Sequence, residues 1–198
     1  MTRRLALLYC VLLLSACAQV QVKHYLPSGD GELRNRSLCT FGLRDELEMT
    51  LTRGVKLRVW GGDPESSALA ARIQMIVPPG QHMRFTSNRF ELFVNGAAAP
   101  TVLHTTGITT VCPEGDANCK SRFAPTDRLE GGVTASDSLL KSAEPRTYRL
   151  DLAVPLPPGE AYTLKLPDVE VNWDLRQGIT VRFEKTSTAA AANLSVCQ

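Results

Sequence analysis

The sequence lacks an apolar run long enough to cross a bilayer, and it lacks an excess of charge. A membrane-spanning helix needs about 20 consecutive apolar residues, and the one long apolar stretch extends only from Leu5 to Leu14. The 198 residues include 22 basic and 20 acidic side chains, so the chain has no large positive surplus for binding phosphates. We therefore expect neither a transmembrane helix nor a nucleic-acid partner.

The N-terminal segment has the order of parts of a signal peptide. Arg3 and Arg4 precede the apolar run, and small residues follow it. The sequence LSAC, which ends at Cys17, resembles the lipobox of bacterial lipoproteins. The resemblance implies that residues 1–16 are removed, that the Cys17 sulfur carries diacylglycerol, and that its amino group carries an acyl chain such as palmitate. Two or three acyl chains, at about 0.8 kcal/mol per buried CH₂, hold a domain at a membrane.

The residue after the lipidated cysteine directs sorting in double-membraned bacteria, where aspartate favours the inner membrane. Here Ala18 and Gln19 follow Cys17, so the resemblance implies an outer-membrane lipoprotein that faces the periplasm or the cell exterior. Removal of residues 1–16 takes away two arginines and no acid, which leaves 20 basic and 20 acidic side chains. About 180 residues remain, enough for one good-sized domain or at most two small ones.

Four further cysteines lie in the body of the chain, an even number that suits disulfides in an exported protein. Four cysteines allow three pairings. Locality favours Cys112 with Cys119, because the PEGDAN between them is rich in turn-forming residues. Cys39 is then left with Cys197, a bridge worth about 3 to 5 kcal/mol. The spacing between Cys112 and Cys119 does not fit a zinc site, and we predict no bound metal.

Alternation of apolar and polar residues with a period of two dominates the chain from residue 47 onward. In Tyr148, Leu150, Leu152 and Val154, for example, apolar side chains alternate with polar ones. The pattern predicts short helices only at Glu65–Ala71 and Ser136–Glu144. It predicts strands at Leu47–Leu51, Val55–Trp60, Arg72–Val77, His82–Phe85, Arg89–Val94, Thr101–Thr110, Thr147–Val154, Tyr162–Leu166, Val169–Trp173 and Gly178–Glu184.

Many short strands separated by Pro and Gly are typical of a β-sandwich. We predict an all-β, immunoglobulin-like antiparallel β-sandwich with Greek-key connections, linked by disulfides, over residues 39–198. Residues 17–38 are predicted to form the lipidated N-terminus and a tether. Within that tether, VQVKHYL also alternates, so an early edge strand is the alternative there.

The triplet PPG occurs at residues 78–80 and again at 157–159. An alternating strand precedes each triplet, and two more follow it. One interpretation is an old duplication that gives two related halves or two small sandwiches. The other is that strands joined by Pro-Gly turns resemble each other by necessity. Aligning the triplets superposes four apolar pairs: Met83 on Tyr162, Phe85 on Leu164, Phe90 on Val169 and Leu92 on Val171.

Known catalytic motifs are absent: HExxH, GxSxG, and the Walker and dinucleotide glycine patterns do not occur. Ser138 and Lys141 form an SxxK pattern, but they lie in a segment typical of a loop leading into a short helix capped by Ser136 or Asp137. We predict no catalytic residue, no cofactor and no enzyme activity. The sequence contains three histidines, His24, His82 and His104. None has a cysteine or serine nearby at a spacing that would indicate a catalytic or metal site.

The predicted function is binding or assembly in the cell envelope, with an envelope protein as the partner. One alternative is a subunit of an envelope-spanning secretion machine, by analogy with the small β-sandwich lipoprotein of type VI secretion. The other is a hydrolase of envelope glycans or peptides, which would need a deep pocket with convergent ionisable groups. Trp60 and Trp173 are expected to plug the ends of the sandwich, and a contact with a sugar or partner is the alternative.

Overall fold

Seventeen strands and one short 3₁₀ helix, η1 (Thr52–Gly54), make up the part of the chain that the computed structural model describes. The described residues are 19–35, 40–41, 43–105, 107–111, 121–132, 144–154 and 157–192. The predicted lipidation site, both predicted disulfides and the SxxK pair lie outside these residues: Cys17, Cys39, Cys112, Cys119, Cys197, Ser138 and Lys141.

The strands form three antiparallel sheets. The first sheet contains β1 (Gln19–Ser28), β3 (Thr40–Phe41), β8 (Arg89–Val94), β9 (Thr101–His104), β14 (Ala161–Lys165) and β17 (Thr180–Ala192). Its order is β1-β17-β14-β8-β9, with β3 also beside β17. The second sheet contains β2 (Glu32–Arg34), β4 (Glu46–Thr50), β5 (Lys56–Trp60), β6 (Leu69–Val77), β10 (Ile108–Thr110), β11 (Arg122–Phe123) and β13 (Arg146–Val154). Its order is β11-β10-β13-β6-β5-β4-β2.

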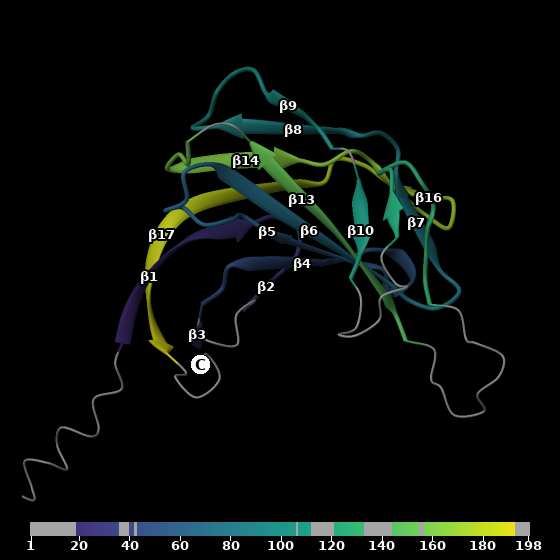
Figure 1. The fold of residues 1–198 in the computed structure, drawn as a ribbon, viewed down its shortest axis with the longest axis horizontal. Coiled ribbons are helices and arrows are strands. Elements are labelled where there is room, and N and C mark those ends of the chain that lie inside the picture. Colours follow the sequence, from purple (N-terminus) through teal and green to yellow (C-terminus); the bar gives the residue numbers. More distant parts are fainter. Residues whose placement is uncertain are drawn as a thin grey trace, which may run out of the picture.

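The third sheet, called the small sheet, extends the layer of the first. It contains β7 (His82–Phe85), β12 (Leu129–Glu130), β15 (Val169–Val171) and β16 (Asp174–Arg176), in the order β12-β7-β15-β16. Strand β7 leads into β8, and β14 leads into β15. Where the sheets meet, the Thr86 N–H donates to the Asp168 carbonyl at 2.8 Å. Figure 1 shows β8, β14 and β17 in one layer and β4, β5, β6 and β13 in another.

The core lies between these layers and follows from the alternation of the strands. In β6 every second residue from Leu69 to Val77 is buried, and in β13 the same holds from Tyr148 to Val154. The two strands pair along their full length, so both rows of apolar side chains point into one core. The all-β prediction is confirmed, and the arrangement of sheets is sandwich-like.

An aromatic stack joins the two layers. The Tyr162 ring stacks on Phe183 with centroids 4.7 Å apart, and Tyr25 meets Tyr162 edge-on at 5.0 Å. The Tyr162 hydroxyl donates to the carbonyl of Gly61, in the connection between β5 and β6. A Cβ at Gly61 would lie 2.5 Å from the Phe183 ring, so glycine is needed for this close approach.

The repeated PPG triplets mark two halves that share one core. Strand β6 pairs with β13, β8 pairs with β14, and β7 pairs with β15. The alignment of the triplets makes β7 equivalent to β14 and β8 equivalent to β15. If the two halves are exchanged, β8 takes the place of β15 and β14 takes the place of β7. The β8–β14 pair then becomes the β15–β7 pair, as in a twofold arrangement. Each half completes the sheets of the other, which rules out two separate small sandwiches.

Several boundaries differ from the sequence prediction. His82–Phe85 and Arg89–Val94 are confirmed as strands at both ends. The predicted strand Thr101–Thr110 is wrong as one element, because β9 lies in the first sheet and β10 in the second. The predicted helix at Glu65–Ala71 is also wrong: β6 begins at Leu69, where pairing with β13 outweighs the helical propensity of alanine.

Residues assigned to a tether belong to the fold. The ten residues of β1 pair with β17, and β2 pairs with β4. Tyr25, in the middle of β1, is 1% exposed and belongs to the core. The edge-strand alternative for VQVKHYL is confirmed, and the folded region includes residues 19–34, upstream of the predicted start at residue 39.

The outer face of the second sheet holds a buried carboxylate. Leu47 and Met49 point into the core, so Glu48 points outward, yet its side chain is only 4% exposed. Cations from the flanking strands cover it, at 3.3 Å for Arg34, 2.9 Å for Lys56 and 2.7 Å for Arg58. Burial alone would raise the pKa of Glu48, but the hydrogen bonds and charges of Lys56 and Arg58 outweigh it and hold the pKa below 4.5.

We expect Glu48→Gln to lower the free energy of unfolding by about 2 kcal/mol at pH 7. The ionised carboxylate stabilises the fold above pH 4.5, and this contribution is lost as the pH falls through the lowered pKa. The variant and the wild type should therefore converge in acid, as measured by urea unfolding at both pH values. Glu32→Gln is the control: Glu32 contacts Arg34 at 3.0 Å but is exposed, so it should lose about 0.5 kcal/mol or less. Equal losses for both variants would contradict the prediction.

Candidate functional site

Trp173 is the most exposed large apolar side chain of the described residues, with 75% of its surface accessible. Leu175, two residues further on, is 53% exposed. Trp60, in contrast, is half-buried and lies under the Arg72 guanidinium, 5.4 Å from the ring centroid. The expectation that both tryptophans plug the sandwich is therefore wrong for Trp173, because it precedes β16 (Asp174–Arg176), whose residues are all exposed.

A strained turn presents Trp173. Val171 pairs with Asp174, so Asn172 and Trp173 form a two-residue turn between β15 and β16. Both have positive φ, 47° for Asn172 and 76° for Trp173, as a type I′ turn requires. Asparagine tolerates this conformation and glycine is favoured in it, whereas a bulky residue there costs about 1 to 2 kcal/mol.

The equivalent turn in the other half has the residues that the geometry favours. Asn95 and Gly96 follow β8 with φ of 50° and 73°. The Asn95 N–H donates to the Ala161 carbonyl at 2.8 Å, and the Asn95 side-chain oxygen accepts from the Ala161 N–H at 3.3 Å. Asn172 makes the same two bonds with His82, at 3.1 and 3.0 Å. Strand register makes the two turns equivalent, because Val94 pairs with Tyr162 as Val171 pairs with Met83, two residues away from the match that the PPG triplets alone would give. One position thus holds Gly96 in the first half and Trp173 in the second.

Trp173 lies beside the outer face of the small sheet. Met83, Phe85, Leu129, Val169 and Val171 fill the inner face and are fully buried, so the alternate residues of these strands point outward. On the outer face Arg84 pairs with Glu170 at 2.9 Å, and Arg128 with Glu130 at 3.4 Å. We call this surface the small-sheet face, made up of His82, Arg84, Arg128, Glu130, Glu170, Trp173 and Leu175.

His82 supports the Trp173 ring. The two rings meet edge-on, with centroids 5.6 Å apart and planes at 77°. Arg128 donates from Nη2 to His82 Nδ1 at 3.0 Å, and because a guanidinium only donates, Nδ1 must be unprotonated. Nε2 then carries the hydrogen, and it is buried with no hydrogen-bond partner among the described residues. Burial, followed by the charge of Arg128, lowers the pKa of His82 below 6.5.

We expect the fold to lose stability as the pH falls below 6.5. Above that value His82 is neutral both folded and unfolded, whereas below it the unfolded chain takes up a proton more readily. Protonated Nδ1 also cannot accept the Arg128 hydrogen bond. Thermal unfolding between pH 7 and pH 5 should show a larger decrease in Tm for the wild type than for His82→Gln. The same decrease in both proteins would assign the effect to other groups.

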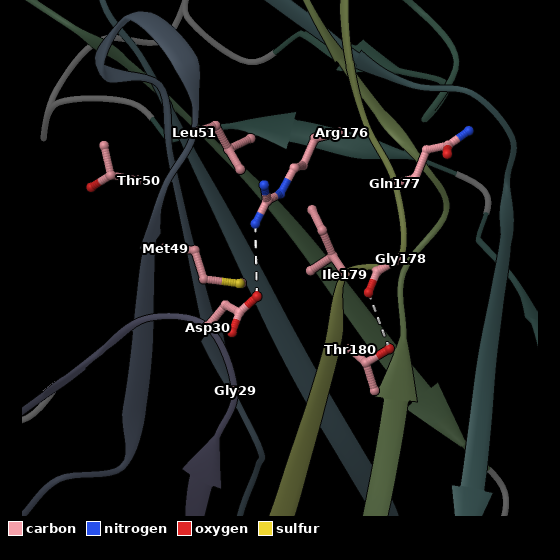
Figure 2. A pocket seen from close by; sticks show the side chains of 10 residues that line it. All are labelled: Gly29, Asp30, Met49, Thr50, Leu51, Arg176, Gln177, Gly178, Ile179 and Thr180. Atoms are coloured by element: carbon pink, nitrogen blue, oxygen red, sulfur yellow. Dashed lines mark hydrogen bonds and ion pairs between the residues drawn. The ribbon is translucent and has the colours of Figure 1, made fainter.

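A cavity of about 280 Å³ lies next to β16, between the two layers (Figure 2). The turn after β1, the end of β4 and the segment after β16 line it. Asp30 and Arg176 face each other across it at 3.7 Å, and Met49 and Ile179 contribute apolar surface. Both charged side chains are exposed, so the pair resembles a surface ion pair that is worth little energy.

A second, more open cavity of about 320 Å³ adjoins the small-sheet face. Residues 79–82 of the first PPG turn, Arg128 and residues 130–132 line it, and His82 and Arg128 belong to both the cavity and the face. A Cβ at Gly131 would lie 1.8 Å from the Pro78 carbonyl oxygen, so glycine lets these two segments meet. The exposed Arg128 guanidinium at this cavity can donate hydrogen bonds to a ligand or partner seated beside Trp173.

The described residues contain no group of three or more His, Cys, Asp or Glu side chains that could hold a metal ion. No helix in the same residues is long and apolar enough to cross a membrane. No family model, curated protein or solved structure matches this chain. The fold itself defines the class: an all-β protein with three antiparallel sheets in a sandwich-like arrangement.

Sequence reasoning singled out Trp173 but assigned it to burial, and it missed Arg128 as a partner of His82. The sequence did contain one indication that Trp173 is exposed at a functional site. The motif Asn95-Gly96 and the motif Asn172-Trp173 both follow a strand that comes after a PPG triplet. A tryptophan where the related turn has glycine breaks a local rule, and such positions are expected at functional sites.

Proposed function

We propose that the protein is a bacterial lipoprotein, anchored to the outer membrane through Cys17, whose sandwich binds an envelope protein without catalysing a reaction. The observation that carries the proposal is the exposed Trp173 on its strained turn, beside the small-sheet face. Strain of this kind persists where the surrounding structure maintains it, and it clusters at binding sites. The asparagine bonds to His82 supply that support.

The chemistry of the face favours a protein over other partners. Tryptophan and arginine are the residues most enriched among those that dominate binding energy at protein interfaces. Trp173 and Leu175 are exposed apolar side chains on the edge hairpin, and charged pairs such as Arg84 with Glu170 lie beside them on the neighbouring strands. Exposed apolar side chains next to polar ones are usual in such an interface.

The finer features of the fold belong to the same proposal. An immunoglobulin-like arrangement with Greek-key connections is supported by the way β6 and β13 pass, after each PPG triplet, into strands of the opposite layer. Disulfides joining Cys112 to Cys119 and Cys39 to Cys197 are supported by the even number of cysteines and by an exported location.

We expect the mass of the mature protein, extracted from the envelope, to equal that of residues 17–198 plus diacylglycerol and one acyl chain. Cys17→Ser should abolish fatty-acid labelling and leave a soluble or uncleaved product, since acyl chains provide the anchor. The measured mass should be lower by two hydrogen atoms for each disulfide. Non-reducing peptide mapping identifies which cysteines are paired. Unchanged labelling of Cys17→Ser, or four free thiols, would contradict the corresponding part of the proposal.

A further inference from the structure

Strands β1 and β17 continue together beyond the rest of the first sheet. Strand β14 pairs with β17 only as far as Glu184, whereas β1 pairs with it up to Ala191. Residues 19–24 and 186–191 therefore form a two-stranded arm, beside which β3 adds two residues at the end of β17. The outer end of the arm curves away from the layers in Figure 1, whereas His24 at its base is buried. Six residues in each strand give it a length of about 20 Å.

The arm contains no acidic residue. Its two strands read QVQVKH and TSTAAA. Lys23 forms an exposed ion pair with Glu65 at 2.7 Å, which ties the arm to the connection between β5 and β6. The outermost residues of the arm, Gln19, Val20 and the three alanines 189–191, carry no charge. A layer of lipid headgroups would therefore meet no repelling or strongly hydrated charge there.

The chain between the predicted lipidation site and the arm is very short. Cys17 and Gln19 are two residues apart, so their Cα atoms can be separated by at most about 7 Å. The headgroup region of one leaflet is about 5 to 8 Å thick. If Cys17 carries acyl chains in the hydrocarbon, Gln19 must lie in or directly above the headgroups.

We infer that the tip of this arm is seated in the headgroup layer of the membrane that holds the acyl chains of Cys17. The inference rests on the proposed lipid anchor, and it replaces a flexible tether with a paired, two-stranded stalk. In Figure 1, β7 and β16 lie on the side of the molecule opposite the start of β1. The small-sheet face is therefore turned away from the membrane, toward a partner that approaches from the aqueous side.

The test measures tryptophan fluorescence of the lipidated protein in vesicles of phosphatidylethanolamine and phosphatidylglycerol, with and without brominated acyl chains. Trp60→Phe leaves Trp173 as the only emitter. Adding Trp173→Gly and Ala189→Trp to that variant moves the emitter to the arm, at an exposed position. Position 189 lies opposite Gln21, two residues from the outer end of the arm, so bromine should reduce the emission from this position. Emission from Trp173 should be unchanged.

A matched control lengthens the connection without altering the fold. A flexible Gly-Ser segment of about 12 residues between Ala18 and Gln19 adds an average reach of about 20 Å and should abolish quenching at position 189. Absent quenching in a protein whose mass shows acyl chains would overturn the inference and leave the anchor intact. Equal quenching at both positions would also overturn it, since the domain would then lie flat. A protein without acyl chains would overturn both proposals.

Discussion

Trp173→Gly is expected to raise the free energy of unfolding by about 1 kcal/mol, although it removes the largest side chain of the hairpin. The φ of 76° disfavours any residue with a Cβ by about 1 to 2 kcal/mol. The lost contact with His82 offsets part of the gain, but Trp173 is mostly exposed. Urea unfolding measures the difference.

Two control variants isolate the strain. Trp173→Ala keeps a Cβ in the left-handed conformation, so it should show no gain in stability. Gly96→Ala places a Cβ at the equivalent turn, where nothing lies within 4 Å, and should lose about 1 kcal/mol from backbone strain alone. A loss of stability in Trp173→Gly would show that the indole supports the fold and would remove the main argument for a binding role.

The same substitution should weaken binding of the partner protein by about 30-fold or more, because removal of a central tryptophan from an interface typically costs at least about 2 kcal/mol. A photo-crosslinking amino acid in place of Leu175 reports the contact in living cells. The cross-linked product should form with Trp173 present and be lost in both Trp173→Gly and Trp173→Ala. An unchanged yield in either variant would contradict the proposed face.

Gly62→Ala is expected to lower the free energy of unfolding by about 3 kcal/mol, since backbone strain and overpacking add at this position. Gly62 has a φ of 82°, and a Cβ there would lie 2.3 Å from the Ala70 carbonyl oxygen. The obstacle is backbone of β6, which is fixed by its pairing with β5 and β13. The neighbouring Gly61 carbonyl accepts from Tyr162, so displacement would also disturb the aromatic stack.

Gly80→Ala is the matched control for this prediction. Gly80 has a φ of 72°, close to that of Gly62, but a Cβ at Gly80 would meet no atom within 4 Å. It should therefore lose only about 1 kcal/mol, from strain. Thermal or urea unfolding of both variants separates the two contributions. Similar losses for Gly62→Ala and Gly80→Ala would show that the close approach to Ala70 has no energetic consequence.

Local patterns in the sequence determined the strands that are regular along their whole length. In β8, Phe90 and Leu92 alternate with polar neighbours, and both strand ends were predicted correctly. The same reasoning failed at residues 101–110, because the alternation continues while the chain changes from one sheet to the other. The alternation of apolar and polar residues indicates which side chains face a core, but it carries no information about which sheet a strand joins.

The sequence by itself determined the all-β class and the repetition around the PPG triplets, and it offered the edge strand near the N-terminus only as an alternative to a tether. It also supplied the LSAC motif, from which the anchor at Cys17 is proposed. Only the tertiary structure decided that the two halves exchange strands, since that depends on pairing between residues far apart in the chain. That pairing makes Asn172-Trp173 the counterpart of Asn95-Gly96 and leaves the indole outside the core, because the turn that carries it leads into the edge strand β16, whose residues are all exposed.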